Sequence, residues 1–136
     1  MPQVVSTGAP HLLVGVKTRA DVDKARPDAD RLLPQLRAAE AEGCYLFSTQ
    51  HRGDELTAYA RFFNPTVGLW EDSATGTAAG PLAAFLSVHE LVEQGQPIVI
   101  EQGRFMGRPS ILTIDFQNGV ELSGSGVIVM KGSLIL

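Results

Sequence analysis

The sequence predicts an α+β fold in which an antiparallel sheet wraps around one central, buried helix. A chain of 136 residues is long enough for one compact domain, which we expect to span residues 1–136. Short apolar segments bounded by turn residues recur along the chain and indicate strands. Between them, Ala78 to Glu93 would carry apolar side chains on almost every side of a helix. Such a helix must be enclosed by other parts of the protein.

Before this central helix, the sequence predicts a strand pair and a surface helix. Val4 to Val16 holds two apolar runs around a turn fixed by Pro10, which indicates strand, turn and strand. Pro27 to Glu42 repeats apolar residues at helical spacing. Asp28 is placed to cap this helix and Gly43 to end it.

Further strands are expected on both sides of the central helix. Cys44 to Thr49 and Thr57 to Phe63 indicate two strands joined around the polar turn Arg52-Gly53-Asp54. In the last third, Asn118-Gly119 is a strong hairpin signal, and the strands should form one antiparallel meander. Their predicted ranges are Ile98–Gln102, Ser110–Gln117, Val120–Ser123 and Val127–Leu136.

Composition and charge argue against several functional classes. The formal net charge is −4 and the chain has no basic stripe, so nucleic acid is not an expected partner. No apolar run approaches the length of a membrane span and the first residues lack signal-peptide features, so we expect a cytoplasmic protein without a membrane partner. Cys44 is the only cysteine, which excludes an internal disulfide and a two-thiol mechanism.

The charges are unevenly distributed along the chain. Residues 1–66 hold 16 of the 26 charged side chains, whereas residues 67–136 hold only 10. Depletion of charge is typical of the centre of an interface. We therefore expect the second half to meet a partner, with Trp70 as an interface candidate.

The segment Glu71–Pro81, which leads into the central helix, is the predicted binding loop. It is small, hydroxylic and rich in glycine, so a ligand could reach its backbone. Pro81 cannot lie deep in a helix and limits the helix start to around Thr77. The amides of residues 76–79 would then largely lack helical acceptors and form a site for a carboxylate or phosphate.

Asp72 lies one loop away from these amides. Its carboxylate could accept a hydrogen bond from a ligand hydroxyl or amine, or transfer a proton. The alternative from the residues alone is that Thr75 or Thr77 only caps the helix and that the glycines only permit close packing.

Three motifs give the chain a family resemblance. Glu71-Asp72-Ser73-Ala74-Thr75-Gly76-Thr77-Ala78-Ala79-Gly80-Pro81-Leu82 is similar to the Glu-Asp-Pro-Ala-Thr-Gly-Ser-Ala-Ala-Gly-Pro-Leu signature of the phenazine biosynthesis PhzF-like family. Glu101 to Ser110 resembles that family's Gln-Gly-x-x-Met-Gly-Arg-Pro-Ser, and Val5 to Leu12 resembles the opening of its second domain. The motifs span nearly the whole chain.

The resemblance implies a fold and an activity. The family has the diaminopimelate epimerase-like fold, in which two similar domains each wrap an antiparallel sheet around a helix and enclose the active site between them. Its type member is an isomerase of dihydro-hydroxyanthranilate that moves a proton without metal or cofactor. This chain would be one half-domain of that fold, the C-terminal one, with no cofactor and no metal site.

The resemblance also implies site residues. Asp72, Gly76 and Thr77 would contact the substrate, and Ala78 belongs to the same cluster of amides. Ser73 stands where the family usually has proline, and Thr77 where it usually has serine. The family's general acid/base glutamate belongs to the first domain and has no match in this chain. Asp72 is therefore the best catalytic candidate.

We thus expect an isomerase half-domain that binds a small carboxylate-bearing metabolite. It would be active, if at all, as a homodimer or with a separately encoded N-terminal-domain partner; a truncated chain is the third explanation. The alternative function is a non-catalytic small-molecule-binding or assembly module that has lost the family's general acid/base.

A few other side chains have both a functional and a structural interpretation. His11 follows the first turn and could border the cleft, whereas His89 is expected to be a core histidine. Arg104 and Arg108 could pair with a substrate carboxylate. The structural alternative is a surface charge or an ion pair with Glu101.

Overall fold

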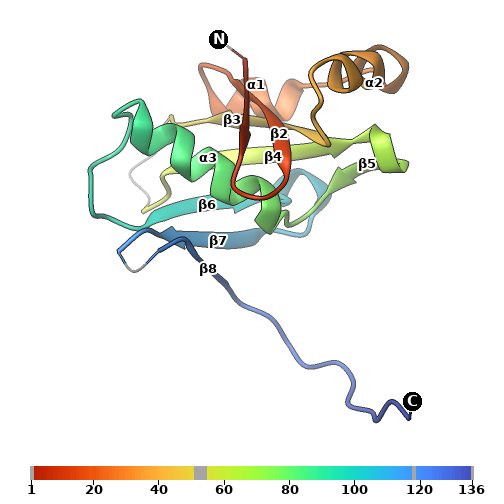
Figure 1. The fold of residues 1–136 in the computed structure, drawn as a ribbon, viewed down its shortest axis with the longest axis vertical. Coiled ribbons are helices and arrows are strands. Elements are labelled where there is room, and N and C mark those ends of the chain that lie inside the picture. The colour runs from red at the N-terminus through yellow and green to blue at the C-terminus, as the bar shows by residue number, and fades with distance from the viewer. Residues whose placement is uncertain (1, 51–54, 118, 136) are drawn as a thin grey trace.

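The computed structural model describes residues 2–50, 55–117 and 119–135. These residues form one eight-stranded sheet, three α-helices and two 3-10 turns (Figure 1). The predicted turn at Arg52-Gly53-Asp54 lies outside the described residues, as does Asn118 of the predicted hairpin. The elements are β1 (Gln3–Ser6), β2 (Pro10–Gly15), α1 (Arg19–Lys24), α2 (Ala29–Ala38), β3 (Gly43–Ser48), β4 (Ala58–Asn64), η1 (Pro65–Val67), β5 (Leu69–Asp72), α3 (Gly76–Val88), β6 (Ile98–Gln102), η2 (Arg104–Met106), β7 (Ser110–Asp115) and β8 (Glu121–Gly124).

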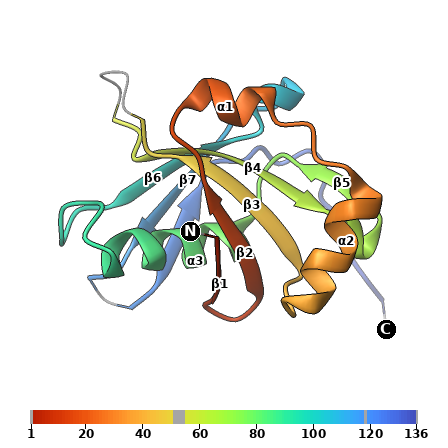
Figure 2. The ribbon, with the colours of Figure 1, turned by 90° about the horizontal axis from the view of Figure 1, so that it is seen from above.

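The sheet has the strand order β1-β2-β3-β4-β6-β7-β8, with β5 paired to β4. Seen from above, its strands curve around α3, while α1 and α2 lie on the other side of the sheet (Figure 2). The predicted α+β fold with a sheet around a buried helix is confirmed. The sheet is mainly antiparallel, but the pairs β2–β3 and β4–β6 are parallel. Each of these pairs is joined by a segment containing a helix, because parallel neighbours need a long crossover.

The main core lies between α3 and the concave face of the sheet. From α3, Ala78, Ala79, Leu82, Ala83 and Leu86 are fully buried. Their mostly small side chains let the helix approach the strands closely, and larger side chains from the sheet fill the remaining space. These sheet residues are Leu13, Tyr45, Phe47, Phe62, Ile98, Ile100, Leu112 and Ile114.

A smaller core lies under α2 on the convex face. Leu36 is fully buried there beside Ala41 and Cys44, and Leu12 and Val14 of β2 pack against them. The two faces of β2 therefore contact different cores, as the alternation of side chains along a strand requires.

The two ends of α2 test two capping predictions. Asp28 is the N-cap, as predicted, because its carboxylate accepts hydrogen bonds from the amides at the start of the helix. The other end differs from the prediction, since the helix stops at Ala38 and Glu40 takes the left-handed conformation with φ of 54°. Gly43 instead opens β3, where a Cβ would lie 2.4 Å from the ring of Phe62. This glycine serves close packing rather than helix termination.

The short helix α1 is absent from the sequence-based prediction, although a capping box marks its start. The Thr18 hydroxyl accepts from the Asp21 amide, and the Asp21 carboxylate accepts from the Thr18 amide. Arg61 of β4, itself buried, donates to three carbonyl oxygens between Val22 and Ala25. The Nε and Nη2 groups of Arg61 form a bidentate ion pair with the Glu71 carboxylate, with both N–O distances at 2.8 Å. Arg61 thus ties α1 to β5, the strand that leads into the predicted binding loop.

Three predictions in the second half are wrong. The central helix ends at Val88 rather than Glu93, and His89 is its exposed C-cap rather than a core residue. Glu90 follows in the left-handed conformation with φ of 54°, which turns the chain out of the helix. Residues 127–135 form no strand and lead away from the body of the protein (Figure 1). Their apolar side chains suit a strand, but no neighbouring strand of the described chain pairs with them.

Candidate functional site

The predicted binding loop ends where α3 begins. Thr75 is the N-cap residue, and its carbonyl oxygen accepts hydrogen bonds from the amides of Ala78 and Ala79, each at 3.1 Å. The amides of Gly76 and Thr77 have no acceptor among the described residues. Of the four amides in the predicted cluster, two are therefore available to a ligand at the positive end of the helix.

A fully buried glutamine, Gln102 at the end of β6, holds this loop in place. Its Nε2 donates to the Asp72 carbonyl oxygen at 2.8 Å and to Thr75 Oγ1 at 2.9 Å. Its Oε1 accepts from the Tyr45 hydroxyl at 2.8 Å and from the Thr75 amide at 3.2 Å. Both donors and both acceptor positions of the Gln102 amide are thus used.

The same network fixes the Asp72 carboxylate. Thr75 Oγ1 accepts a hydrogen bond from Gln102, so its own hydroxyl proton is available for a hydrogen bond to Asp72 Oδ2, which lies 2.7 Å away. The Thr75 side chain donates its hydrogen bond to Asp72 and makes no capping hydrogen bond to the helix. Thr75 therefore does more than occupy the N-cap position, because its side chain also holds Asp72.

Tyr45 stays a hydrogen-bond donor in this network. Burial raises the pKa of its hydroxyl, and the negative charge of Asp72 raises it further. A protonated phenol and the Thr75 amide both point at Oε1 of Gln102. These two donors set the orientation of the Gln102 amide, because flipping it would place its NH₂ group against them.

Gly103 is where two of the three motifs meet. It has φ of +83°, and a Cβ there would lie 2.2 Å from the Arg108 carbonyl oxygen and 2.6 Å from the Ser73 carbonyl oxygen. Both the conformation and the close approach require glycine. The Gln-Gly pair of one motif therefore packs directly against the loop formed by the other.

A groove of about 510 Å³ lies beside the start of α3. Leu122 of β8 forms one wall, since a Cβ on Gly76 would lie 2.5 Å from its Cδ2. Thr7 of the β1–β2 turn forms another, since a Cβ on Gly80 would lie 2.8 Å from its Oγ1. The lining residues are Thr7, Asp72, Ala74, Thr75, Gly76, Thr77, Gly80, Ile114, Val120 and Leu122.

The structure brings three of the four predicted substrate-binding residues to this groove. Asp72 and Gly76 are half-buried, and Thr77 is exposed. Ala78 is fully buried and its amide is bonded to Thr75, so it belongs to the first turn of α3 without lining the groove. Contact between these residues and a substrate stays a prediction.

His11 of β2 lies next to the groove residue Thr77. Its side chain is 2% exposed, and its Nε2 lies 3.3 Å from Thr77 Oγ1. The ring packs edge-on against Phe62 with the centroids 5.1 Å apart, and Nδ1 has no hydrogen-bond partner among the described residues. Burial lowers the pKa of His11, although the charge of Glu42 acts in the opposite direction. The neutral imidazole is thus favoured.

Other charged candidates are engaged elsewhere. Arg104 forms an ion pair with Glu101, which also binds Arg19 at 2.7 Å, so the structural alternative for Arg104 is confirmed. Arg108 is exposed in the turn before β7. Trp70 is 43% exposed on β5, which suits the interface expected for it.

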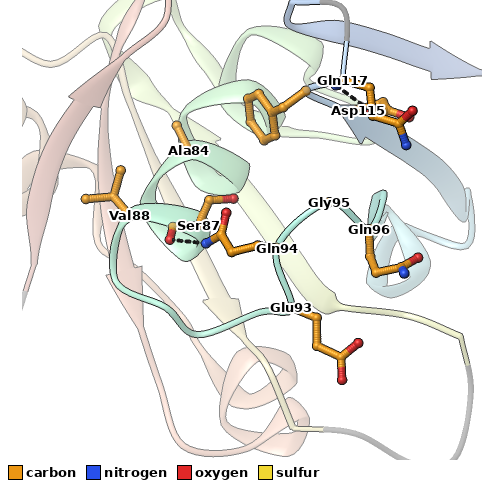
Figure 3. A pocket seen from close by; sticks show the side chains of 10 residues that line it. Ala84, Ser87, Val88, Glu93, Gln94, Gly95, Gln96, Asp115 and Gln117 are labelled. Atoms are coloured by element: carbon orange, nitrogen blue, oxygen red, sulfur yellow. Dashed lines mark hydrogen bonds between the residues drawn. The ribbon is translucent and has the colours of Figure 1, made fainter.

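A second cavity, of about 400 Å³, lies at the other end of α3 (Figure 3). Glu93 and Asp115 are among its lining residues, and the Gln94 amide donates to the Ser87 carbonyl oxygen at 2.9 Å. None of the predicted site residues lines it. Within the described residues, no group of three or more His, Cys, Asp or Glu side chains could hold a metal ion. None of the described helices is long and apolar enough to span a bilayer.

A protein-family model described as phenazine biosynthesis-like protein, PhzC-PhzF, matches residues 1–132. The chain belongs to this PhzF-like family. The resemblance carried by the three motifs is thereby confirmed. Two of these motifs meet at Gln102 and Gly103, where the second motif packs against the loop of the first.

Relatives of this PhzF-like chain include named isomerases. It is 35% identical over 140 residues to the trans-2,3-dihydro-3-hydroxyanthranilate isomerase of Pseudomonas chlororaphis, covering 98% of this chain and 48% of that protein. It is 31% identical over 143 residues to an uncharacterised isomerase of Clostridium acetobutylicum, covering 98% and 47%. The chain spans about half the length of the curated relatives it matches.

Solved structures agree with the fold. A protein of Pseudomonas aeruginosa described as a predicted epimerase superimposes with a TM-score of 0.71 at 34% identity, covering 96% of this chain and 46% of that one. A PhzF family protein of Bacillus anthracis gives a TM-score of 0.66 at 19% identity, covering 86% and 42%. The second likeness concerns the fold alone.

Sequence reasoning missed the two residues that organise the loop, Tyr45 and Gln102. A signal for Gln102 was present, because it is the polar last residue of the apolar segment Ile98–Gln102 and opens the Gln-Gly motif. A buried polar residue at the end of a strand needs hydrogen-bond partners. Tyr45 carried no such signal within its apolar strand.

Proposed function

We propose that this PhzF-like chain forms one half of a proton-shifting, cofactor-independent isomerase site whose groove binds a small carboxylate-bearing metabolite. The observation that carries the proposal is the placement of Asp72. Its Oδ2 is held 2.7 Å from Thr75 Oγ1 at the edge of the groove that also contains the available amides of Gly76 and Thr77. A carboxylate acceptor and two amide donors thus share one groove.

These groups divide the binding of a ligand between them. The two amides and the positive helix end favour a ligand carboxylate. The Asp72 carboxylate has spare acceptor positions after its bond from Thr75, and these suit a hydroxyl, an amine or a transferable proton of the ligand. The isomerase relatives support this chemistry, because the Pseudomonas chlororaphis protein is named for a substrate that carries a hydroxyl, an amine and a carboxylate.

The groove of this chain supplies only part of the acid/base chemistry. Asp72 is the only titratable side chain among its described lining residues. A proton shift needs a group that takes the proton from one carbon and returns it to another, and the family's general acid/base glutamate has no match in this chain. We propose that the missing group comes from a second copy of the chain or from a separately encoded partner that resembles the family's first domain.

The exposed apolar surface supports such an interface. Of the large apolar side chains that are exposed in the described residues, all but Val4 lie after residue 66. Three of them, Ile111, Val120 and Leu122, are 44%, 57% and 49% exposed on or beside β7 and β8. Burying this surface against a partner would enclose the groove and exclude water from it.

Proton exchange in deuterated water tests the proposal. We expect trans-2,3-dihydro-3-hydroxyanthranilate or a related cyclic amino acid to incorporate deuterium when incubated with the chain in its self-associated or partner-bound form. Asp72→Asn should abolish the exchange, whereas Asp30→Asn, on the exposed surface of α2, should not change it. Molecular mass in solution identifies which assembly is present. Exchange that appears only after addition of a first-domain partner would reject the homodimeric enzyme.

A second candidate function is a non-catalytic binding module. The single titratable side chain in the groove favours it, because binding needs the amides but no acid/base pair. In that case small carboxylates would raise the melting temperature and Asp72→Ala would weaken their binding, without deuterium incorporation in any assembly. If no small carboxylate changes the melting temperature at high concentration, both candidates fail.

A further inference from the structure

We propose that His11 is a positioning residue for the groove, because its ring holds the Thr77 hydroxyl with the proton directed at an oxygen of the bound carboxylate. The ligand class rests on the proposed function above. The role of His11 itself rests on its contacts with Thr77 and with the core.

The surroundings of His11 leave its ring little freedom. The side chain is 2% exposed, and its ring stands at 89° to that of Phe62. Its backbone is held between β1 and β3. The only polar side-chain atom within hydrogen-bond distance in the described residues is Thr77 Oγ1, 3.3 Å from Nε2. A buried imidazole packed against Phe62 thus meets one hydroxyl at the first turn of α3.

The burial of Nδ1 decides which nitrogen carries the proton. A neutral imidazole has one N–H, and Nδ1 is buried without a hydrogen-bond partner in the described part of the chain. A proton on Nδ1 would bury an unpaired N–H, which is rarer in proteins than an unpaired acceptor. A proton on Nε2 donates to Thr77 Oγ1 instead. Burial lowers the pKa of His11, which agrees with the neutral form.

This tautomer sets the direction of the Thr77 hydroxyl proton. Because Thr77 Oγ1 accepts from His11, its own O–H must find an acceptor elsewhere. Thr77 is exposed and lines the groove, where the amides of Gly76 and Thr77 also find no acceptor within the residues that the structure describes. Three donors, the Thr77 hydroxyl and the two amides, then lie in the first turn of α3 beside the groove, in which Asp72 is the one acidic lining residue of the described chain. A carboxylate, which only accepts hydrogen bonds, matches them better than a neutral amide does.

Side-chain ¹⁵N NMR and binding measurements on the full chain test the proposal. In long-range ¹H–¹⁵N spectra, we expect Nε2 of His11 to be the protonated nitrogen, with the signals assigned by their loss in His11→Gln. The binding probes are 3-hydroxyanthranilate and its neutral carboxamide. His11→Leu and Thr77→Val should each weaken binding of the carboxylate roughly tenfold to a hundredfold, with little effect on the amide.

Conservative and double variants separate positioning from a structural role. Thr77→Ser keeps the hydroxyl and His11→Gln can keep an N–H donor near the position of Nε2, so both should retain most of the affinity. The double variant His11→Leu/Thr77→Val should bind no more weakly than either single variant, because both remove the same interaction. Circular dichroism confirms that each variant is folded.

Three results would overturn the proposal. A proton on Nδ1 in the free protein contradicts the tautomer, and additive losses in the double variant show that His11 acts independently of Thr77. Equal losses in His11→Gln and His11→Leu in folded proteins show that no donor at this position is needed. If the wild-type chain binds neither probe, the proposed function fails, and the NMR result alone then supports or refutes the contact between His11 and Thr77.

Discussion

Replacing Gln102 with leucine removes the side chain that connects the binding loop to the core. Leucine fills a similar volume, but it offers neither the Oε1 acceptor nor the Nε2 donors. The hydroxyl of Tyr45, which is fully buried, and the amide of Thr75 each lose an acceptor. The Asp72 carbonyl oxygen and Thr75 Oγ1 lose a donor.

The size of the effect follows from the two orphaned donors. A buried donor left without a partner costs about 1–3 kcal/mol, so two of them cost about 2–6 kcal/mol. Burying an apolar side chain in place of a polar one offsets about 1–2 kcal/mol of this loss in the free energy of unfolding. The middle of these two ranges gives an expected loss of about 2–3 kcal/mol in the free energy of unfolding for Gln102→Leu, together with a looser Asp72 loop.

Urea denaturation with Tyr45→Phe as a second substitution tests this reasoning. In the wild-type background, Tyr45→Phe removes one hydrogen bond and should cost about 1 kcal/mol. In the Gln102→Leu background it removes an orphaned hydroxyl and should be neutral or stabilising. Gln35→Leu on the exposed face of α2 is the control and should change stability by about 0.5 kcal/mol at most. An equal cost of Tyr45→Phe in both backgrounds would refute the network.

Three further predictions concern single sites. Gly103→Ala should lower the free energy of unfolding in urea by about 3 kcal/mol or more, because its Cβ would meet two backbone carbonyl oxygens. The control Gly107→Ala, with φ of +69° and nothing within 4 Å of its Cβ, should lower it by about 1 kcal/mol. Similar costs for the two variants would contradict the close approach at Gly103. Burial raises the pKa of Cys44 to about 12, so its thiol should react with an aromatic disulfide reagent in urea but hardly at all in the native protein; rapid native reaction would show that β3 is accessible. Because burial lowers the pKa of His11 below 6.5, the unfolded chain takes up a proton first as the pH falls, and the free energy of unfolding should drop between pH values of about 7 and about 5. His11→Leu should reduce that drop, and an unchanged pH profile would contradict the burial of a neutral imidazole.

The overall fold was predictable because its main determinant is local. The segment that became α3 is apolar on nearly every side, and this alone predicts that a sheet must enclose it. The parallel pairing of β2 with β3 was not predictable in the same way. It depends on the path of the chain through α1 and α2, and α1 is a six-residue helix whose capping box is easily taken for a turn.

The candidate site was predictable only in part. The loop from Asp72 to Thr77 could be recognised from its composition and its motif, because a glycine-rich entry into a helix has a known physical use. The clamp on that loop depends on Gln102, which lies 27 residues after Thr75 and reaches it only through the sheet register. Hydrogen bonds of that kind are decided by tertiary packing rather than by spacing in the sequence.

The glycines of the binding loop join the two interpretations that the sequence left open. One was that they admit a ligand, and the other was that they only permit close packing. A Cβ on Gly76 would collide with Leu122, and one on Gly80 with Thr7, and these two side chains are walls of the groove. Close packing against the glycines therefore sets the shape of the space offered to a ligand. A larger residue at either position would displace one wall of the groove. The groove therefore depends on the close packing that the second interpretation proposed.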